Sequence, residues 1–291
     1  ACKNLAIYGS GAAVGDLAKL LPNAELSSWA RIALESIPGD EASEALRTAT
    51  DSLEGKLLVG TINSIGVRRD ATAVDSLTPR LQHADAEVAS AAAVALGRIG
   101  NVAAADSLRK SLAAAPANIR SSIAEGCVLC AERFLSEGNS AEAVAIYDEV
   151  RAAEVPMQRI VEATRGAILA RGQDGIPMLV EQFQSPQKPL FQLALTTARE
   201  FPGSDVDNVL VTELVRATPD RGALIVQAMA DRQGFLRGNL SKHLVGLAID
   251  HLHYHSTAVM VDRKLQVLRH SLNLIVDRIH SLGNSLGRGL L

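Results

Sequence analysis

Cys127 and Cys130 form a C-x-x-C pair, a spacing used for redox exchange, zinc binding and haem attachment. Haem attachment requires a histidine directly after the pair, and Ala131 stands there. A zinc site requires a second pair of ligands, and none lies nearby in the sequence. The role of the two cysteines therefore depends on the element that carries them.

The second candidate is an H-x-H-x-H motif formed by His251, His253 and His255. On a helix, the first and last of these would share one face at i, i+4, as metal ligands do. On a strand, all three would point the same way. The simpler interpretation is a polar, partly exposed stretch of helix, and we therefore predict no metal site. Metal binding by these three histidines, within segment 243–255, is kept as the alternative.

Glycines near the start, Gly9, Gly11 and Gly15, suggest a phosphate-binding loop. A P-loop requires Gly-Lys-Ser/Thr, and a dinucleotide fingerprint requires a preceding strand and a fixed spacing. Both are missing, so we predict a turn between helices. With no nucleophile–base constellation in the chain, we predict no catalytic residue and no cofactor.

A helical repeat runs through most of the chain. In segment 74–100, apolar residues at helical spacing form two short helices around a turn with Asp85 as an N-cap candidate. Shifts of 31 and 102 residues reproduce the pattern, and shorter copies lie upstream, the first with Leu26 in its second helix. The predicted first-helix anchors are Leu17, Leu46, Leu77, Leu108, Ile146, Leu179 and Leu210.

The repeat assigns roles to other residues. Cys127 and Cys130 take the places of Leu96 and Ile99, so we predict that both cysteines are core residues. Glycines that include Gly39, Gly66, Gly100 and Gly203 are expected to end second helices. Six arginines are expected on the surface, solvated or at helix ends: Arg31, Arg68, Arg69, Arg98, Arg165 and Arg199.

Segments 16–37 and 85–100 resemble the HEAT-repeat (armadillo-like) family in its short form. Segment 127–150 departs from it, with a longer second helix followed by a tetratricopeptide-like helix. More narrowly, residues 1–232 resemble HEAT segments of large multidomain planctomycete-type bacterial proteins. The resemblance implies an all-α fold, a right-handed α-solenoid of about seven helical hairpins, and carries no catalytic residue onto this chain.

Composition supports this class. The 291 residues are 47% hydrophobic, 21% charged and 3% aromatic, with net charge −3, which argues against disorder and against an aromatic-rich β-sandwich. No apolar run is long enough for a transmembrane helix. No secretory signal pattern stands at the start, so we expect any targeting signal to lie upstream of Ala1, in a larger protein.

The charge is uneven along the chain. Residues 1–232 hold 22 basic and 29 acidic residues, whereas residues 233–291 hold 7 basic and 3 acidic ones together with six of the seven histidines. We therefore predict a repeat array over 1–232 and a basic, His-rich helical segment over 233–291. Apolar residues in steps of four and three over 258–286 predict a helix that packs within the chain, self-associates or lies on a membrane surface.

The leading functional hypothesis is a non-enzymatic scaffold that binds a protein partner on the extended surface of the array. Nucleic-acid binding is not expected, because the array is acidic. The alternative is a metal-binding or metal-dependent module centred on the His-rich segment 243–255.

Overall fold

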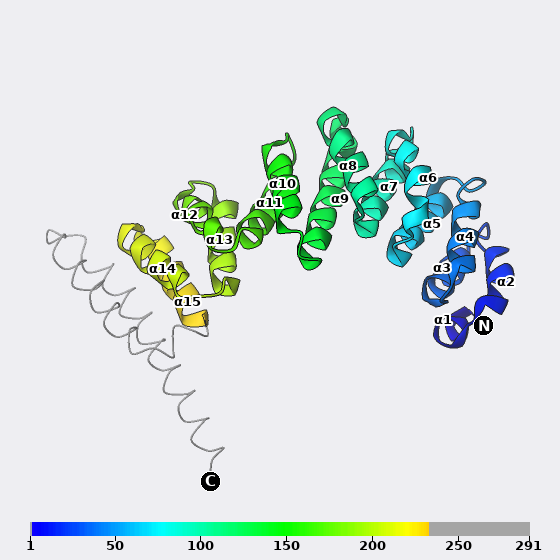
Figure 1. The fold of residues 1–291 in the computed structure, drawn as a ribbon, viewed down its shortest axis with the longest axis horizontal. Coiled ribbons are helices and arrows are strands. Elements are labelled where there is room, and N and C mark those ends of the chain that lie inside the picture. Colours follow the sequence, from blue (N-terminus) through cyan, green and yellow to red (C-terminus); the bar gives the residue numbers. More distant parts are fainter. Residues whose placement is uncertain (1, 233–291) are drawn as a thin grey trace, which may run out of the picture. The chain divides into compact units, whose positions relative to one another are not determined.

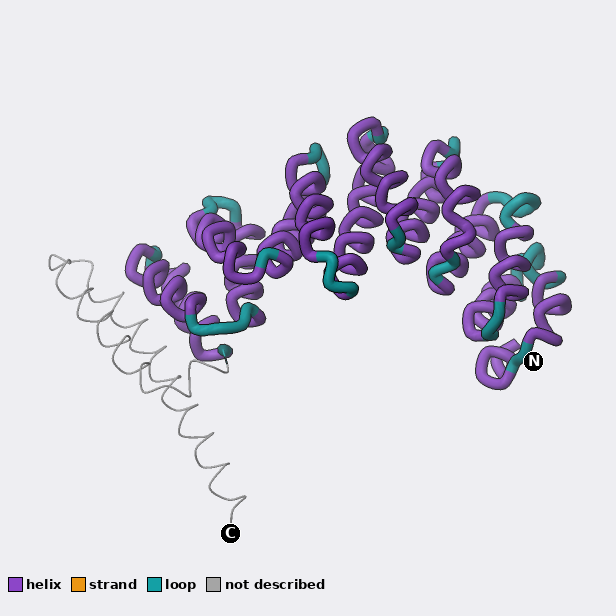
Figure 2. Tube along the Cα trace, in the orientation of Figure 1, coloured by secondary structure: helices purple, strands orange, loops and turns teal. Residues whose placement is uncertain are grey.

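The computed structural model describes residues 2–232, and within them every regular element is a helix (Figures 1 and 2). The predicted C-terminal segment 233–291, its helix over 258–286 and the three candidate metal ligands lie outside the described residues. The chain divides into two compact units, one ending at Arg171 and the other beginning at Gly172. No helix in the described part is long and apolar enough to cross a bilayer.

In the first unit, the helices alternate between two layers. The layer of second helices contains α1 (Cys2–Tyr8), α3 (Ser27–Ser36), α5 (Gly55–Arg68), α7 (Ala86–Ile99), α9 (Ala117–Ser136) and α11 (Met157–Ala170). The layer of first helices contains α2 (Val14–Ala18), α4 (Asp40–Ala49), α6 (Val74–Leu77), α8 (Val102–Ala114) and α10 (Ser140–Ala152). Each second helix packs against the next one in sequence, as α5 does against α7 and α7 against α9.

The second unit contains two further hairpins among its described residues. α12 (Ile176–Gln184) pairs with α13 (Lys188–Glu200), and α14 (Asp205–Arg216) pairs with α15 (Pro219–Asp231). In the same pattern as the first unit, α12 contacts α14 and α13 contacts α15. The two hairpins therefore stack first helix on first helix and second on second.

The predicted repeat is confirmed. All seven first-helix anchors, from Leu17 to Leu210, are at most 1% exposed. Cys127 and Cys130 are buried in α9, as their places in the repeat predict. The all-α class and the seven hairpins therefore follow from the spacing of apolar residues, since each hairpin buries its stripe against its neighbours.

Two second-helix predictions are wrong. Gly66 does not end its helix: α5 continues to Arg68, and Arg69 takes the left-handed conformation with φ 53°. A Cβ on Gly66 would lie 2.8 Å from the Cα of Ala95, so this glycine permits close packing against α7. Leu26 is 41% exposed rather than buried, because it precedes α3 as its N-cap residue.

Two glycines allow α7 and α9 to approach each other closely. A Cβ on Gly97 would lie 2.6 Å from the Cα of Gly126, and a Cβ on Gly126 would lie 2.5 Å from the carbonyl oxygen of Ala93. Only glycine fits at these two positions of the α7–α9 contact, because it has no Cβ. Segment 127–150 also departs from the repeat as predicted, since α9 has 20 residues where α7 has 14.

Candidate protein-binding surface

Five large apolar side chains stand exposed on three consecutive second helices, and we call this set the apolar patch. It consists of Ile7 and Tyr8 on α1, Trp29 and Ile32 on α3, and Val67 on α5, which are between 46% and 85% exposed. These are five of the eight large hydrophobic side chains that stand exposed among the described residues. Adjacent helices carry them, because α1 packs on α3 and α3 on α5.

Helical periodicity explains why α3 displays two of these side chains. Its buried stripe runs through Ala30, Ala33 and Leu34, and Trp29 and Ile32 fall outside it. The sequence already carried this signal, because both residues lie off the predicted apolar stripe, and Trp29 is the single tryptophan of the chain. Sequence reasoning nevertheless missed the patch.

Hydrogen bonds beside the patch join α3 to α5. Arg31 of α3 donates from Nη1 to the carbonyl oxygen of Gly60 at 3.0 Å. Ser64 of α5 donates to Oε1 of Glu35 at 2.6 Å. These bonds fix α3 against α5, so the patch is held on a connected pair of helices.

Further along the same layer, the outward side is charged. Arg159 of α11 donates to Glu125 of α9 at 2.7 Å and to Glu162 on its own helix at 2.5 Å. Burial raises the pKa of Glu132 above its ordinary value, and the charge of Arg165 lowers it in part. Arg159 therefore forms ion pairs with a glutamate on each of the two helices, and these charges neutralise one another within the protein.

The prediction that the surface arginines are solvated is wrong for Arg68. From the end of α5 it donates to the carbonyl oxygens of Leu34, Ile37 and Gly39 at 2.6, 2.7 and 2.7 Å. Its Nε donates to Oγ of Ser43 at 2.8 Å. The guanidinium therefore caps the C-terminal end of α3, whose last carbonyls have no partner within the helix.

Arg232 repeats this arrangement in the second unit. It donates to the carbonyl oxygens of Ala198, Phe201 and Gly203 and to Asp207, at sequence separations of 34, 31, 29 and 25 residues. Arg68 has the same four separations. The sequence signal is an arginine 30 residues after a Pro-Gly turn, which sequence reasoning missed.

The remaining candidate motifs fit the fold. Gly9 and Ser10 lie in the turn between α1 and the short helix at Gly11–Ala13, as predicted. The prediction is wrong for Gly15, which lies within α2, and for Gly11, which begins the short helix. Burial raises the pKa of the Cys130 thiol to about 12 and raises that of Cys127 further. No group of three His, Cys, Asp or Glu within residues 2–232 is arranged to hold a metal ion. Metal binding by His251, His253 and His255 stays a prediction.

Comparisons with known proteins agree with the repeat. The family model of HEAT repeats matches residues 54–126, which run from just before α5 into α9. No curated protein matches the chain.

Similar solved structures include an engineered protein, with 18% identity, TM-score 0.42, and coverage of 90% of this chain and 79% of that one. Another is the complex of CpcE and CpcF of phycocyanin lyase from Nostoc sp., with 16% identity, TM-score 0.42, and coverage of 81% and 93%. A third is human deoxyhypusine hydroxylase in complex with glycerol, with 17% identity, TM-score 0.40, and coverage of 93% and 97%. The family match assigns residues 54–126 to HEAT repeats, and the described hairpins together form an all-α helical-repeat fold.

Proposed function

We propose that this protein is a non-enzymatic scaffold that binds a protein partner through the apolar patch on α1, α3 and α5. The observation that carries this proposal is the exposure of Trp29 and Ile32, together with Ile7, Tyr8 and Val67, on adjacent helices. Large apolar side chains exposed on adjacent helices are typical of interaction sites. Tryptophan and tyrosine are the residues that most often dominate binding energy at such sites.

The patch suits a partner that presents apolar side chains. Trp29 and Tyr8 offer large rings, and each also carries one polar group that remains available to a partner at the rim. The hydrogen bonds from Arg31 and Ser64 hold α3 on α5 before binding. Little ordering of this surface is then required when a partner docks, which favours affinity.

A comparative pull-down from native lysate tests the proposal with the full chain as bait. The wild-type protein is compared with the double variant Trp29→Ser/Ile32→Ser and with the control variant Val102→Ser, which removes an exposed apolar side chain at the start of α8. We expect a partner that the wild type and the control retain and the double variant loses. Circular dichroism checks that all three proteins are equally folded.

The dissociation constant of that partner should rise by about 30-fold or more in the double variant, as loss of a binding hot spot implies. The proposal fails if no specific partner is recovered. It also fails if the double variant and the wild type retain the same proteins equally well.

A further inference from the structure

A small cavity lies in the second unit, at the end where both described hairpins turn. Its volume is about 290 Å³, at the lower end of the range for ligand pockets. The C-terminal ends of α12 and α14 and the N-terminal halves of α13 and α15 contribute to its wall. This wall combines apolar and charged side chains, which include Phe183, Phe191, Ile225, Glu213, Arg216 and Arg221.

Glu213 places a buried carboxylate at this cavity, since only 5% of the residue is exposed. Burying a carboxylate costs free energy unless hydrogen bonds and an opposite charge compensate for the lost water. Oε1 of Glu213 accepts from Nε2 of Gln184 at 3.1 Å and from Nη1 of Arg216 at 3.3 Å. The buried acid therefore holds the guanidinium of Arg216, whose side chain is 63% exposed, at the cavity.

Arg221 is held in place by groups of the preceding hairpin. It donates from Nη1 to the carbonyl oxygen of Phe183 at 3.3 Å and from Nη2 to that of Ser185 at 2.7 Å. Its Cζ also lies 4.4 Å from the centroid of the Phe191 ring, within the range of a cation–π contact. None of these partners is an anion, so they orient the guanidinium of Arg221 without neutralising its charge.

The cavity therefore has an excess of positive charge. Two arginines and one glutamate line it, so its ionisable side chains sum to +1. Within residues 2–232, neither arginine forms an ion pair with a second carboxylate. In the first unit the ratio is reversed, because Arg109 alone pairs with both Glu142 and Glu149. At the cavity of the second unit, an anion from outside can supply the missing negative charge.

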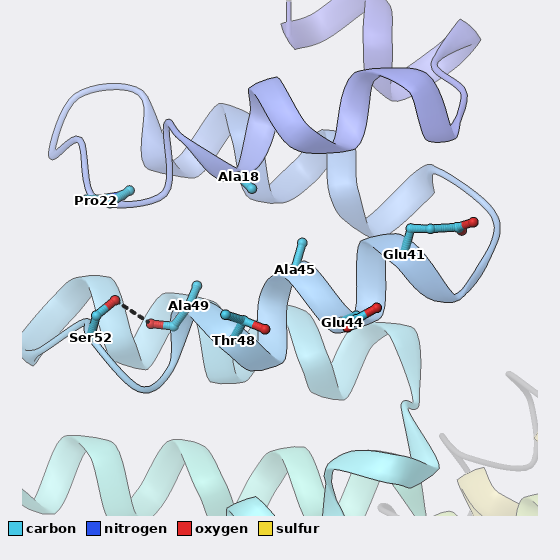
Figure 3. A pocket seen from close by; sticks show the side chains of 8 residues that line it. All are labelled: Ala18, Pro22, Glu41, Glu44, Ala45, Thr48, Ala49 and Ser52. Atoms are coloured by element: carbon cyan, nitrogen blue, oxygen red, sulfur yellow. Dashed lines mark hydrogen bonds between the residues drawn. The ribbon is translucent and has the colours of Figure 1, made fainter.

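A groove between first helices does not by itself gather such charges. In the groove between α2 and α4 of the first unit, Ala18 faces Ala45 across the gap and Ala49 extends the same floor (Figure 3). The two acids that line it, Glu41 and Glu44, are exposed, and no arginine or lysine lines it. The buried acid with two arginines is thus a feature of the cavity in the second unit.

The apolar part of the wall selects the rest of the ligand. The rings of Phe183 and Phe191 meet edge to face with their centroids 6.2 Å apart, and Ile225 adds an aliphatic surface. A small inorganic anion would gain nothing from these groups. A carboxylate joined to an aromatic or aliphatic body can pair with the planar fork of Arg216 and bury its body against them. A cation is disfavoured, because it would meet two guanidinium groups.

We propose that this cavity binds a small carboxylate with an apolar body. Arg216 pairs with the carboxylate, Arg221 adds positive charge, and the body lies against Phe183 and Ile225. A free organic acid and the C-terminal residue of a peptide both present this chemistry. The site lies in the second unit and does not depend on the apolar patch of the first.

Titration of the full chain with phenylpropionate tests the proposal, with binding followed by ligand-observed saturation-transfer NMR. Phenylpropionamide has the same body without the charge. We expect saturable binding of the acid that weakens as salt is raised, and binding of the amide that is weaker by about tenfold or more.

An acetylated tripeptide that ends in phenylalanine with a free carboxylate distinguishes the two sources of the ligand. If it binds more tightly than phenylpropionate, the cavity takes the C-terminus of a peptide. If it binds more weakly, the cavity takes a free organic acid. Either result supports a carboxylate site, provided that one of the two acids binds.

Three variants locate the site. Arg216→Gln removes the charge but keeps a donor for Glu213, and Ala217→Leu enlarges a side chain in the wall of the cavity. Arg98→Gln makes the same change in charge at an exposed position on α7, in the first unit. We expect Arg216→Gln to weaken binding by about tenfold or more, Ala217→Leu to weaken it, and Arg98→Gln to change it by less than about twofold. Circular dichroism checks that all three variants are folded.

Absence of saturable binding of both acids would overturn the proposal, as would equal binding of phenylpropionate and its amide. An affinity unchanged in Arg216→Gln would overturn it too. The apolar-patch variant Trp29→Ser/Ile32→Ser should bind the acid normally, so the two sites can fail or succeed independently.

Discussion

Replacing Arg68 tests whether one arginine holds consecutive hairpins together. In the structure its guanidinium donates to three carbonyl oxygens at the end of α3 and to Ser43, all within 2.8 Å. The change to make is Arg68→Met, which keeps most of the apolar stem and removes every donor. It leaves the carbonyl oxygens of Leu34, Ile37 and Gly39 without their partner.

The expected cost follows from the number and surroundings of these bonds. A hydrogen bond to a charged group contributes about 1.5–3 kcal/mol. Arg68 is only half-buried, so water can replace part of what is lost, and the sum of four such bonds overstates the effect. We expect Arg68→Met to lower the free energy of unfolding by about 2–4 kcal/mol.

Urea unfolding followed by circular dichroism measures the change, from the shift of the midpoint and the slope of the transition. Arg68→Lys should recover only part of the loss, because one ammonium cannot reproduce a planar fork whose two ends reach different carbonyls. Arg69→Met is the matched control, since this neighbouring arginine is exposed, and it should cost less than about 0.5 kcal/mol.

Two outcomes would refute the reasoning. If Arg68→Met costs no more than Arg69→Met, the carbonyls at the end of α3 are satisfied equally well by water. If Arg68→Lys restores full stability, charge alone accounts for the effect and the fork geometry does not. Arg232→Met should cost at least as much as Arg68→Met, because the same four sequence separations recur there and Arg232 is buried, so water replaces less of what is lost.

Two further predictions concern the α7–α9 contact and the buried thiols. Gly126→Val should lower the free energy of unfolding by about 3 kcal/mol or more, because the valine side chain would meet Ala93 and Leu108. The control Gly15→Ala has open space around it and should be neutral or stabilising by up to about 1 kcal/mol. Urea unfolding measures both changes. Because burial raises the pKa of Cys127 and Cys130, the folded thiols stay protonated where unfolded thiols ionise, so stability should fall as pH rises above about 8.5. The slope should approach 1.4 kcal/mol per pH unit for each cysteine and should be shallower in Cys130→Ala; equal slopes in the two proteins would contradict this cause.

The sequence by itself determined the hairpins and the core. Helical spacing placed all seven first-helix anchors correctly, and the shift of 31 residues identified Cys127 and Cys130 as core residues. The prediction succeeds because each helix must bury one apolar stripe, so every repeat shows the same spacing of apolar residues in its own sequence.

The tertiary structure alone decided how neighbouring repeats meet. Gly66 has the sequence context of a helix end, yet its lack of a side chain serves the contact with Ala95 on the next hairpin. Arg68 has the context of a solvated charge, yet it reaches carbonyls about 30 residues earlier in the chain. Both roles depend on a partner that is distant in sequence.

The candidate binding surface shows what periodicity can decide. The exposure of Trp29 and Ile32 follows from their places off the apolar stripe of α3, so the sequence contained that information. The close contact at Gly97 and Gly126, by contrast, depends on α7 and α9 of consecutive hairpins packing against each other. Periodicity fixes which side of a helix is buried, but the packing of neighbouring hairpins decides which residues that side contacts.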